Sequence, residues 1–273
     1  MKRSPIRAVG SAVTAAVSYI FWLAYGIRTS IGRGEKNLIK KTDIGADEPM
    51  RLDVCGDGSC DELMIVNSSC RISEDKTPEI EYFDGEQGMQ IGAAAAFMRL
   101  RGDCVEKFSK NILITSAYRS SEFQARIYET NPYAVPAGTS EHETGLAVDM
   151  KLSGYAHKRF ILTRVGRWIN RNAYKYGFVV RYPFWGRKST GIDFEPWHLR
   201  YVGEPHAEIM TRAKVTLEEY SDLFSEGEFY TFGDYTISYQ SGGDGTVLFP
   251  KNHTDVRISP DNMGKYYIWG KNV

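Results

Sequence analysis

The chain is organised around the stretch Gly138-Thr-Ser-Glu-His-Glu-Thr-Gly-Leu-Ala-Val-Asp-Met150. It places His142 seven residues ahead of Asp149, with Gly145 between them. The aspartate sits within an apolar run that is typical of a buried strand. Because an unpaired carboxylate facing a core is costly, we expect Asp149 to be paired or metal-bound. The alternative is an aspartate that accepts hydrogen bonds from backbone amides at a strand end. We expect Gly145 to form the turn that lets the loop of His142 and the strand of Asp149 converge.

A second cluster lies downstream, Glu195-Pro-Trp-His198. Histidine and aspartate are ligands that zinc takes, and a catalytic zinc site keeps a further position open for water. The residue types therefore suggest a metal site whose ligands are His142, Asp149 and His198. Glu195 is then free for proton transfer, and the competing interpretation is a structural salt bridge. Spacing alone does not place this cluster, because Pro196 disturbs a helix or a strand.

The flanking segments predict a mixed α and β domain. Apolar patterning and propensity indicate strands at 64–67, 111–117, 145–151 and 178–182, and helices at 87–100, from 121 onward and at 158–176. Arg119 stands at a strand-to-helix junction, because Ser121 followed by Glu-Phe-Gln fits the start of a capped helix. Such a junction is a common place for a functional side chain, and the alternative is a surface cation. His157, His206 and His253 belong to no motif, so we expect them to be surface or core residues.

The composition indicates a folded protein without a nucleic-acid partner. Lys plus Arg and Asp plus Glu number 34 each, so the net charge is zero. A protein that neutralises phosphates needs a basic surplus, which this chain lacks.

The N-terminal segment predicts a membrane element. The stretch Ala8–Ile27 carries no charged residue, and its length matches the roughly 20 residues that cross a bilayer as a helix. Basic residues stand on both sides of it, so they do not decide its orientation. A cleaved signal peptide is the alternative, but no small-residue cleavage site follows. We therefore expect an uncleaved single-pass anchor in the cell membrane, with the remainder of the chain extracytoplasmic.

The four cysteines fall between the predicted anchor and the motifs, at Cys55, Cys60, Cys70 and Cys104. An even number in one region of a translocated chain predicts two disulfides, with three possible pairings. Four buried free thiols in a cytosolic domain is the alternative.

Several motifs together resemble one known family. They are Ser140-x-His-x-x-Gly-x-Ala-x-Asp149, Glu195-x-Trp-His-x-Arg-Tyr-Val-Gly203, Ser116-Ala-Tyr-Arg-Ser120 with Gln124, and Tyr176-Gly-Phe178 through Pro183. This set is similar to the D-alanyl-D-alanine carboxypeptidases of the VanY type, zinc peptidases grouped with lysostaphin and the hedgehog amino-terminal fold. The resemblance covers residues 64–220, and its motifs follow the family's order.

The resemblance implies a role for each matching residue. The Zn²⁺ ligands would be His142, Asp149 and His198, and Glu195 would be the catalytic base. Arg119 would meet the substrate's terminal carboxylate or its carbonyl oxyanion, since its planar fork pairs with two oxygens. The other expected substrate-binding residues are Gln124, Ser140 and Trp197.

The resemblance also implies a fold and an activity. We expect an α+β fold in which a small antiparallel sheet carries the zinc site and helices pack on it. The predicted parts are an anchor (1–28), a linker with a cysteine-containing loop (29–60), a carboxypeptidase domain (61–226) and a β-rich appendage (227–273). The implied reaction removes the terminal D-Ala from peptidoglycan stem peptides or precursors, which destroys the terminus that glycopeptides bind. Alternatives are an L,D-carboxypeptidase, a D,D-dipeptidase, a peptidoglycan endopeptidase and a non-catalytic cell-wall-binding module.

Overall fold

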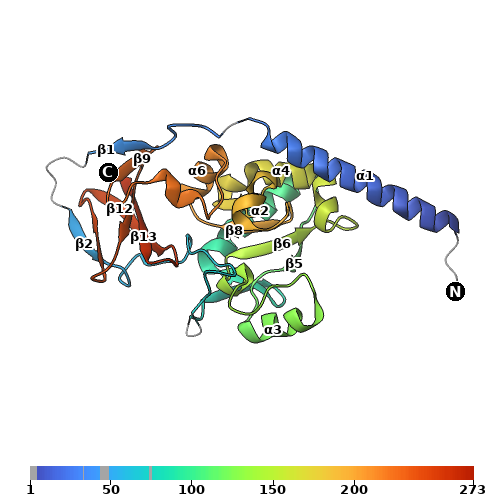
Figure 1. Cartoon of the computed structure of the whole chain (residues 1–273), viewed down its shortest axis with the longest axis horizontal. Coiled ribbons are helices and arrows are strands. Elements are labelled where there is room, and N and C mark those ends of the chain that lie inside the picture. Colours follow the sequence, from blue (N-terminus) through green and yellow to red (C-terminus); the bar gives the residue numbers. More distant parts are fainter. Residues whose placement is uncertain (1–4, 33, 44–48, 74–75) are drawn as a thin grey trace.

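The computed structural model describes residues 5–32, 34–43, 49–73 and 76–273, and side chains from residue 14 onward within those ranges. A four-stranded antiparallel sheet with the order β5-β6-β8-β7 lies near the middle of the molecule (Figure 1). Its strands are β5 (Leu113–Ser116), β6 (Ala147–Lys151), β8 (His198–Tyr201) and β7 (Phe178–Val180). The prediction of a mixed fold with small antiparallel sheets and packed helices is confirmed.

The two faces of this sheet have different surroundings. Val148, Met150 and Leu199 point into the main core, which α2 (Ile91–Phe108) covers. Successive side chains of a strand point to opposite faces, so Asp149 and His198 point away from that core. The alternation of the strand residues therefore decides which side of the sheet carries the chemistry.

The helical cover continues beyond α2 in three short pieces. They are η2 (His157–Leu162), α4 (Arg164–Asn172) and η3 (Ala173–Tyr176). The single helix predicted at 158–176 is wrong, because Thr163 starts a new helix by accepting a hydrogen bond from the amide of Gly166. The strand predicted at 64–67 is also wrong: these residues form a loop in which Met64, Ile65 and Val66 are buried without joining a sheet.

The remaining elements of this part are short. They are β3 (Ile80–Asp84) paired with β4 (Gln87–Gln90), α3 (Ser121–Thr130), η1 (Glu141–Thr144), η4 (Phe184–Gly186), α5 (Arg187–Thr190), α6 (His206–Ala213) and η5 (Tyr220–Leu223). A serine caps α3 as predicted, but it is Ser120 and not Ser121: the hydroxyl of Ser120 accepts a hydrogen bond from the amide of Phe123.

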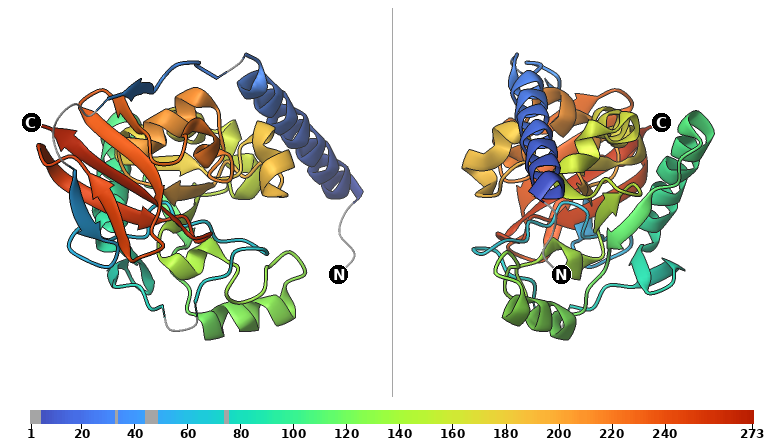
Figure 2. Two further views of the ribbon diagram at one scale, coloured as in Figure 1. Left: turned by 60° about the vertical axis from the view of Figure 1, so that its left-hand side comes forward. Right: turned by 90° about the vertical axis from the view of Figure 1, so that its right-hand side faces the viewer.

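A five-stranded sheet with the order β1-β9-β10-β13-β12 stands beside this part (Figure 2, left). Its strands are β1 (Lys40–Thr42), β9 (Phe229–Phe232), β10 (Tyr235–Ser241), β13 (Lys265–Asn272) and β12 (His253–Pro260), and β11 (Thr246–Phe249) pairs with β2 (Met50–Asp53). Two of these strands, β1 and β2, come from the segment predicted to be a linker. A second core joins this sheet to α6 and η5, with Tyr220, Tyr267 and Trp269 among its buried residues.

The N-terminal segment forms helix α1 (Pro5–Ser30), whose first half extends beyond the rest of the chain (Figure 1). The predicted membrane anchor is wrong: within the described residues, no helix combines the length and the apolar character needed to cross a bilayer. The predicted localisation in the cell membrane, with an extracytoplasmic domain, depended on this anchor and is therefore wrong as well. One side of the second half of α1 is covered by the domain instead of facing outward.

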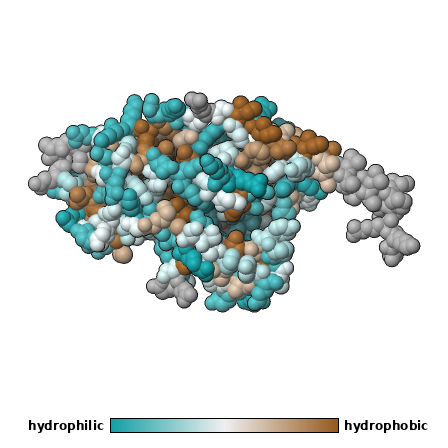
Figure 3. All heavy atoms as spheres, viewed as in Figure 1, coloured by the Kyte–Doolittle hydropathy of each residue, from teal (hydrophilic) through white to brown (hydrophobic). Residues whose placement is uncertain are grey.

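The side chains of α1 divide between two environments. Trp22 and Tyr25 are buried against the domain. Val17, Ile20 and Ile27 are exposed, and apolar side chains line the outer surface of α1 in Figure 3.

The predicted disulfides are also wrong, because all four cysteines are free thiols. Cys104 is buried in the main core, Cys60 and Cys70 pack against the second core, and Cys55 is exposed. Burial raises the pKa of the Cys60 and Cys104 thiols to about 12, so both thiols stay protonated and unreactive at neutral pH.

Candidate metal centre

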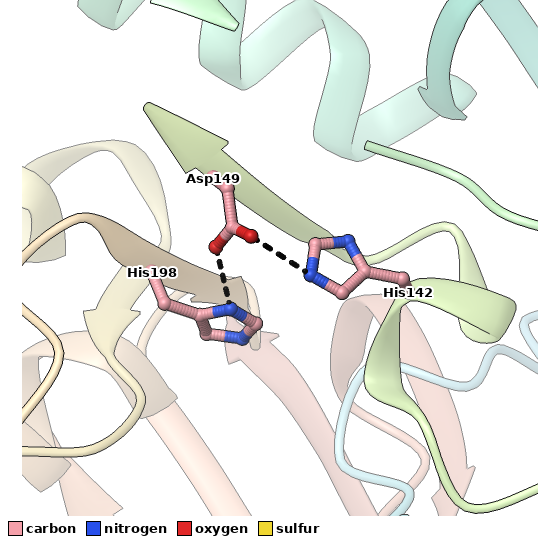
Figure 4. A group of neighbouring side chains, drawn as sticks. All are labelled: His142, Asp149 and His198. Atoms are coloured by element: carbon pink, nitrogen blue, oxygen red, sulfur yellow. Dashed lines mark hydrogen bonds and ion pairs between the residues drawn. The ribbon is translucent and has the colours of Figure 1, made fainter. Parts of the chain in front are cut away.

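Three of the predicted side chains meet on the face of the sheet opposite α2 (Figure 4). Nε2 of His142 lies 3.4 Å from Oδ2 of Asp149, and Nδ1 of His198 lies 2.8 Å from Oδ1 of the same carboxylate. One potential ligand atom from each residue falls within 4.8 Å of the other two. Donors that surround a zinc ion at about 2.0–2.2 Å stand roughly 3–4 Å apart, so this spacing fits one metal ion.

The backbone explains why residues distant in the sequence converge here. Asp149 and His198 are direct partners across β6 and β8, so their side chains project from the same face. His142 arrives on the turn η1, which Ser140 caps. Gly145 ends that turn with φ of 70°, and a Cβ there would lie 2.5 Å from Cδ1 of Ile80. Glycine adopts this positive φ without strain, which agrees with the expected turn.

Both imidazole rings are held in one orientation. Nδ1 of His142 is 2.8 Å from the carbonyl oxygen of Ala117, so its proton sits there and Nε2 faces Asp149. For His198 the ring is reversed: Nδ1 faces Asp149, and Nε2 lies 3.6 Å from Oε2 of Glu141. Nε2 of His198 and Oε2 of Glu141 are both buried, and neither has a hydrogen-bond partner among the described residues. Each ring thus presents a single nitrogen to the site, as a metal ligand must.

The electrostatics of the cluster favour a bound cation. Burial opposes the ionisation of Asp149, but the two histidines outweigh it and hold the pKa of this carboxyl well below its usual range. Burial likewise disfavours charge on His198, yet Asp149 and Glu141 raise its pKa to about 9. Burial lowers the pKa of His142, which leaves the ring neutral. A metal ion fits this donor set, because it replaces the proton that the carboxylates otherwise keep on His198.

Glu141 is a functional residue that sequence reasoning missed. Its Oε1 accepts hydrogen bonds from Nε of Arg181 at 2.6 Å and from Nη1 of Arg200 at 2.9 Å. Arg181 also pairs with Glu218. Glu141, Arg181 and Arg200 are all almost fully buried. The only sequence signal was the position of Glu141 beside a ligand, because its partners lie 40 and 59 residues away.

Glu195 lies in the turn that leads into β8. Its amide donates to the carbonyl of Tyr182 at 3.0 Å, and its own carbonyl accepts from the amide of His198 at 3.1 Å. Burial raises the pKa of the Glu195 carboxyl to about 7, and the charges of His198 and Asp149 also act on it. A carboxyl with a pKa near neutrality is suited to accept and return a proton.

Arg119 borders the ligands on the other side. Its Nη2 is 3.8 Å from Oδ2 of Asp149, Nε donates to Oγ of Ser116 at 2.7 Å, and Nη1 donates to Oε1 of Gln124 at 3.0 Å. Gln124 is fully buried, and its amide nitrogen donates to the carbonyl of Val135. Gln124 therefore influences the candidate ligand Asp149 indirectly, because it holds Arg119 in position beside that carboxylate.

Two further predicted substrate residues have structural contacts. Ser140 is buried, and its hydroxyl accepts a hydrogen bond from the amide of His142. Trp197 is half-buried at the edge of the main core and meets the ring of His157 edge to face, with 5.4 Å between centroids. The structure thus brings the ligands, Glu195 and Arg119 into one region, with Ser140 supporting the ligand turn.

Known proteins share this site-bearing part of the chain. The sequence model of the VanY family, described as D-alanyl-D-alanine carboxypeptidase, matches residues 86–204. A bifunctional D-Ala-D-Ala dipeptidase and D-Ala-D-Ala carboxypeptidase, VanXYC of Enterococcus gallinarum, is 34% identical over 60% of this chain and 95% of its own. The chain belongs to the VanY family.

Other VanY-family and related proteins extend the comparison. A D-alanyl-D-alanine carboxypeptidase of Enterococcus faecium is 36% identical over 66% of this chain, and the match spans 57% of that relative's length. The D,D-dipeptidase VanXYg, solved with a D-Ala-D-Ala phosphinate analog, has a TM-score of 0.70 and 27% identity, covering 84% of this chain and 100% of its own. The D,D-pentapeptidase VanY from a VanB-type cassette, a variant solved with Zn(II), has a TM-score of 0.50 and 30% identity, covering 58% and 98%.

Proposed function

We propose that this VanY-family chain is a zinc-dependent D-alanyl-D-alanine carboxypeptidase that removes the terminal D-Ala from peptidoglycan stem peptides or their precursors. The observation that carries the proposal is the convergence of His142, Asp149 and His198 beside an arginine and a half-buried glutamate. The Zn(II) complex of a related VanY supports the choice of metal.

The ligands would be Nε2 of His142, a carboxylate oxygen of Asp149 and Nδ1 of His198. Three protein ligands leave coordination positions for water and substrate. Bound zinc supplies Lewis acidity, which polarises the scissile carbonyl and lowers the pKa of a water molecule.

The chain's own residues would then move the protons and orient the substrate. Glu195 takes a proton from the attacking water as its oxygen bonds to the carbonyl carbon. As the C–N bond breaks, Glu195 gives that proton to the leaving amine of D-Ala. Arg119 pairs its guanidinium with the terminal carboxylate of the peptide, and Ser116 and Gln124 hold it in place. This arrangement requires a free carboxyl terminus on the substrate.

The length of the preferred peptide is tested by a product profile. Zinc-loaded full-length protein is incubated with a D-Ala-D-Ala dipeptide, a pentapeptide ending in D-Ala-D-Ala and the corresponding tetrapeptide, and the products are identified by mass spectrometry. The proposal expects free D-Ala and tetrapeptide from the pentapeptide. Cleavage of the tetrapeptide alone would instead assign an L,D-carboxypeptidase, and cleavage of the dipeptide alone would assign a D,D-dipeptidase. The absence of any cleavage would favour a cell-wall-binding module.

A further inference from the structure

Helix α1 lies outside the matched residues 86–204, yet it packs beside the candidate active site. Figure 2 (right) shows α1 running along one end of the domain, and its closest elements are η2 and η4. Trp22 and Tyr25 are only 6% and 7% exposed. They form a small core with the buried residues Ile161 and Phe194.

Phe194 is the centre of this contact. Its ring stacks on Trp22 with 5.8 Å between centroids and on Tyr25 with 6.3 Å, and it meets Phe184 edge to face at 6.2 Å. The fit is tight, because a Cβ added at Gly26 would lie 2.0 Å from Cδ2 of Phe184. Burial of aromatic rings of this size is a large contribution to holding two elements together.

Phe194 is the residue directly before Glu195. The amide of Glu195 is fixed by the carbonyl of Tyr182, and the carbonyl of Pro196 accepts a hydrogen bond from Asn170 at 2.8 Å. These bonds hold the backbone of the turn from the domain side, whereas the rings of α1 hold Phe194 from the outside. We propose that Trp22 and Tyr25 of α1 are positioning residues, which keep Glu195 in place through Phe194. The proposal rests on the proposed function of Glu195.

The C-terminal end of α1 is held by contacts that do not involve these rings. Nζ of Lys214 donates to the carbonyls of Thr29, Ile31 and Gly32 at 2.9, 3.0 and 3.1 Å. A lysine at this position satisfies carbonyls that a helix end leaves without partners. The helix therefore has a second attachment, so weakening the aromatic contact is expected to loosen the Glu195 turn without releasing α1 altogether.

The test compares Trp22→Ala with Ile20→Ala in the full chain, because Ile20 is 64% exposed on the same helix. For Trp22→Ala we expect kcat for D-Ala release to fall roughly 10- to 100-fold, the scale of a small displacement of a catalytic group. KM and zinc affinity should stay within about twofold of wild type. Trp22→Phe should recover most of kcat, and Ile20→Ala should match wild type. Gly26→Ala should also lower kcat, since it displaces the helix without removing a side chain.

Two readouts separate positioning from a general effect on stability. In a Glu195→Gln background, Trp22→Ala should cause no further loss of rate, because the group that it positions is already gone. Hydrogen exchange should rise at the amides of Asp193, Phe194, Glu195 and Trp197 in Trp22→Ala and not in Ile20→Ala, since Pro196 has no amide hydrogen. An unchanged kcat, an equal loss in both backgrounds, or unchanged exchange at 193–197 would overturn the proposal. If wild-type protein releases no D-Ala, the proposed function fails, and the exchange experiment still decides the role of α1.

Discussion

Nε2 of His198 faces Oε2 of Glu141 at 3.6 Å, on the side of the ring opposite Asp149. Both atoms are buried and have no closer partner among the described residues. Glu141 is in turn fixed by Arg181 and Arg200. A carboxylate behind a ligating histidine fixes the ring's tautomer and strengthens the ligand. The paired arrangement therefore makes Glu141 a partner of the candidate ligand His198, and we expect it to support metal binding without being a ligand.

Replacing Glu141 with glutamine should weaken zinc binding by about 10- to 100-fold, the usual effect of losing such a partner. Competition with a fluorescent chelator measures the affinity. Glu218→Gln is the matched control, because it removes a partner of Arg181 without touching His198. Equal zinc affinities in Glu141→Gln and wild type would rule out this role for Glu141.

Replacing Arg119 with lysine should lower kcat/KM for pentapeptide by roughly 10- to 100-fold, because an ammonium group cannot hold a carboxylate through two parallel hydrogen bonds. Steady-state D-Ala release measures this, and Arg126→Lys on the exposed side of α3 serves as the control. A pentapeptide with an amidated terminus should be a poor substrate for both proteins, with little difference between them. A full difference on the amidated peptide would assign Arg119 to another part of the substrate.

The buried side chain of His206 should make the free energy of unfolding depend on pH. Burial among Tyr220, Tyr267 and Trp269 lowers the pKa of this imidazole from 6.5 to about 3. Below pH 6.5 the unfolded chain therefore binds a proton that the folded chain does not bind. Stability is full above pH 6.5 and falls as the pH drops toward 3. Between pH 6.5 and 5 the loss should be about 2 kcal/mol.

Urea unfolding at several pH values measures this loss. His206→Gln keeps a polar group near Tyr220 but removes the titration, so its stability should depend less steeply on pH in that window. His253→Gln on β12 controls for the loss of a histidine elsewhere in the fold. A wild-type profile that is flat between pH 6.5 and 5 would contradict the assignment.

Lys158 should influence the pH dependence of catalysis. Burial raises the pKa of Glu195 to about 7, and the positive charge of Lys158 is among the influences that lower it. Because Glu195 must be ionised to act as a base, kcat/KM should fall as the pH drops below this pKa, and a bound metal ion moves the midpoint lower. Lys158→Met should shift this acidic limb to higher pH, whereas Lys175→Met should not. If the acidic limb of the pH profile moved equally in both variants, the shift would reflect only the change in the protein's net charge.

The sequence was sufficient to predict that the candidate ligands carried by local motifs lie together, whereas their roles stay predictions. His142, Asp149 and Gly145 lie within one short stretch, and strand alternation explains why Asp149 leaves the core. The buried ion pairs around the site were not predictable, because no sequence pattern relates Glu141 to Arg181 or Arg200.

The N-terminal helix shows the same limit. Its uncharged stretch was expected to cross a membrane, but Trp22 and Tyr25 pack on Phe194. Hydropathy measures the transfer of a residue from water and does not identify the surface that will cover it. The cysteines were likewise interpreted from number and position, whereas burial keeps Cys104 within a core.

The proposed function depends above all on proton transfer by Glu195 in a zinc-dependent cleavage of D-Ala-D-Ala. The most direct measurement is D-Ala release from a pentapeptide by zinc-loaded wild type and by zinc-loaded Glu195→Gln, with bound zinc quantified in both. The account predicts full zinc occupancy in both proteins, with kcat about 100- to 10,000-fold lower in the variant. Asp193→Asn, an exposed neighbour, should remain active, and a chelator should abolish release in every case. Undiminished release by zinc-loaded Glu195→Gln would contradict the account.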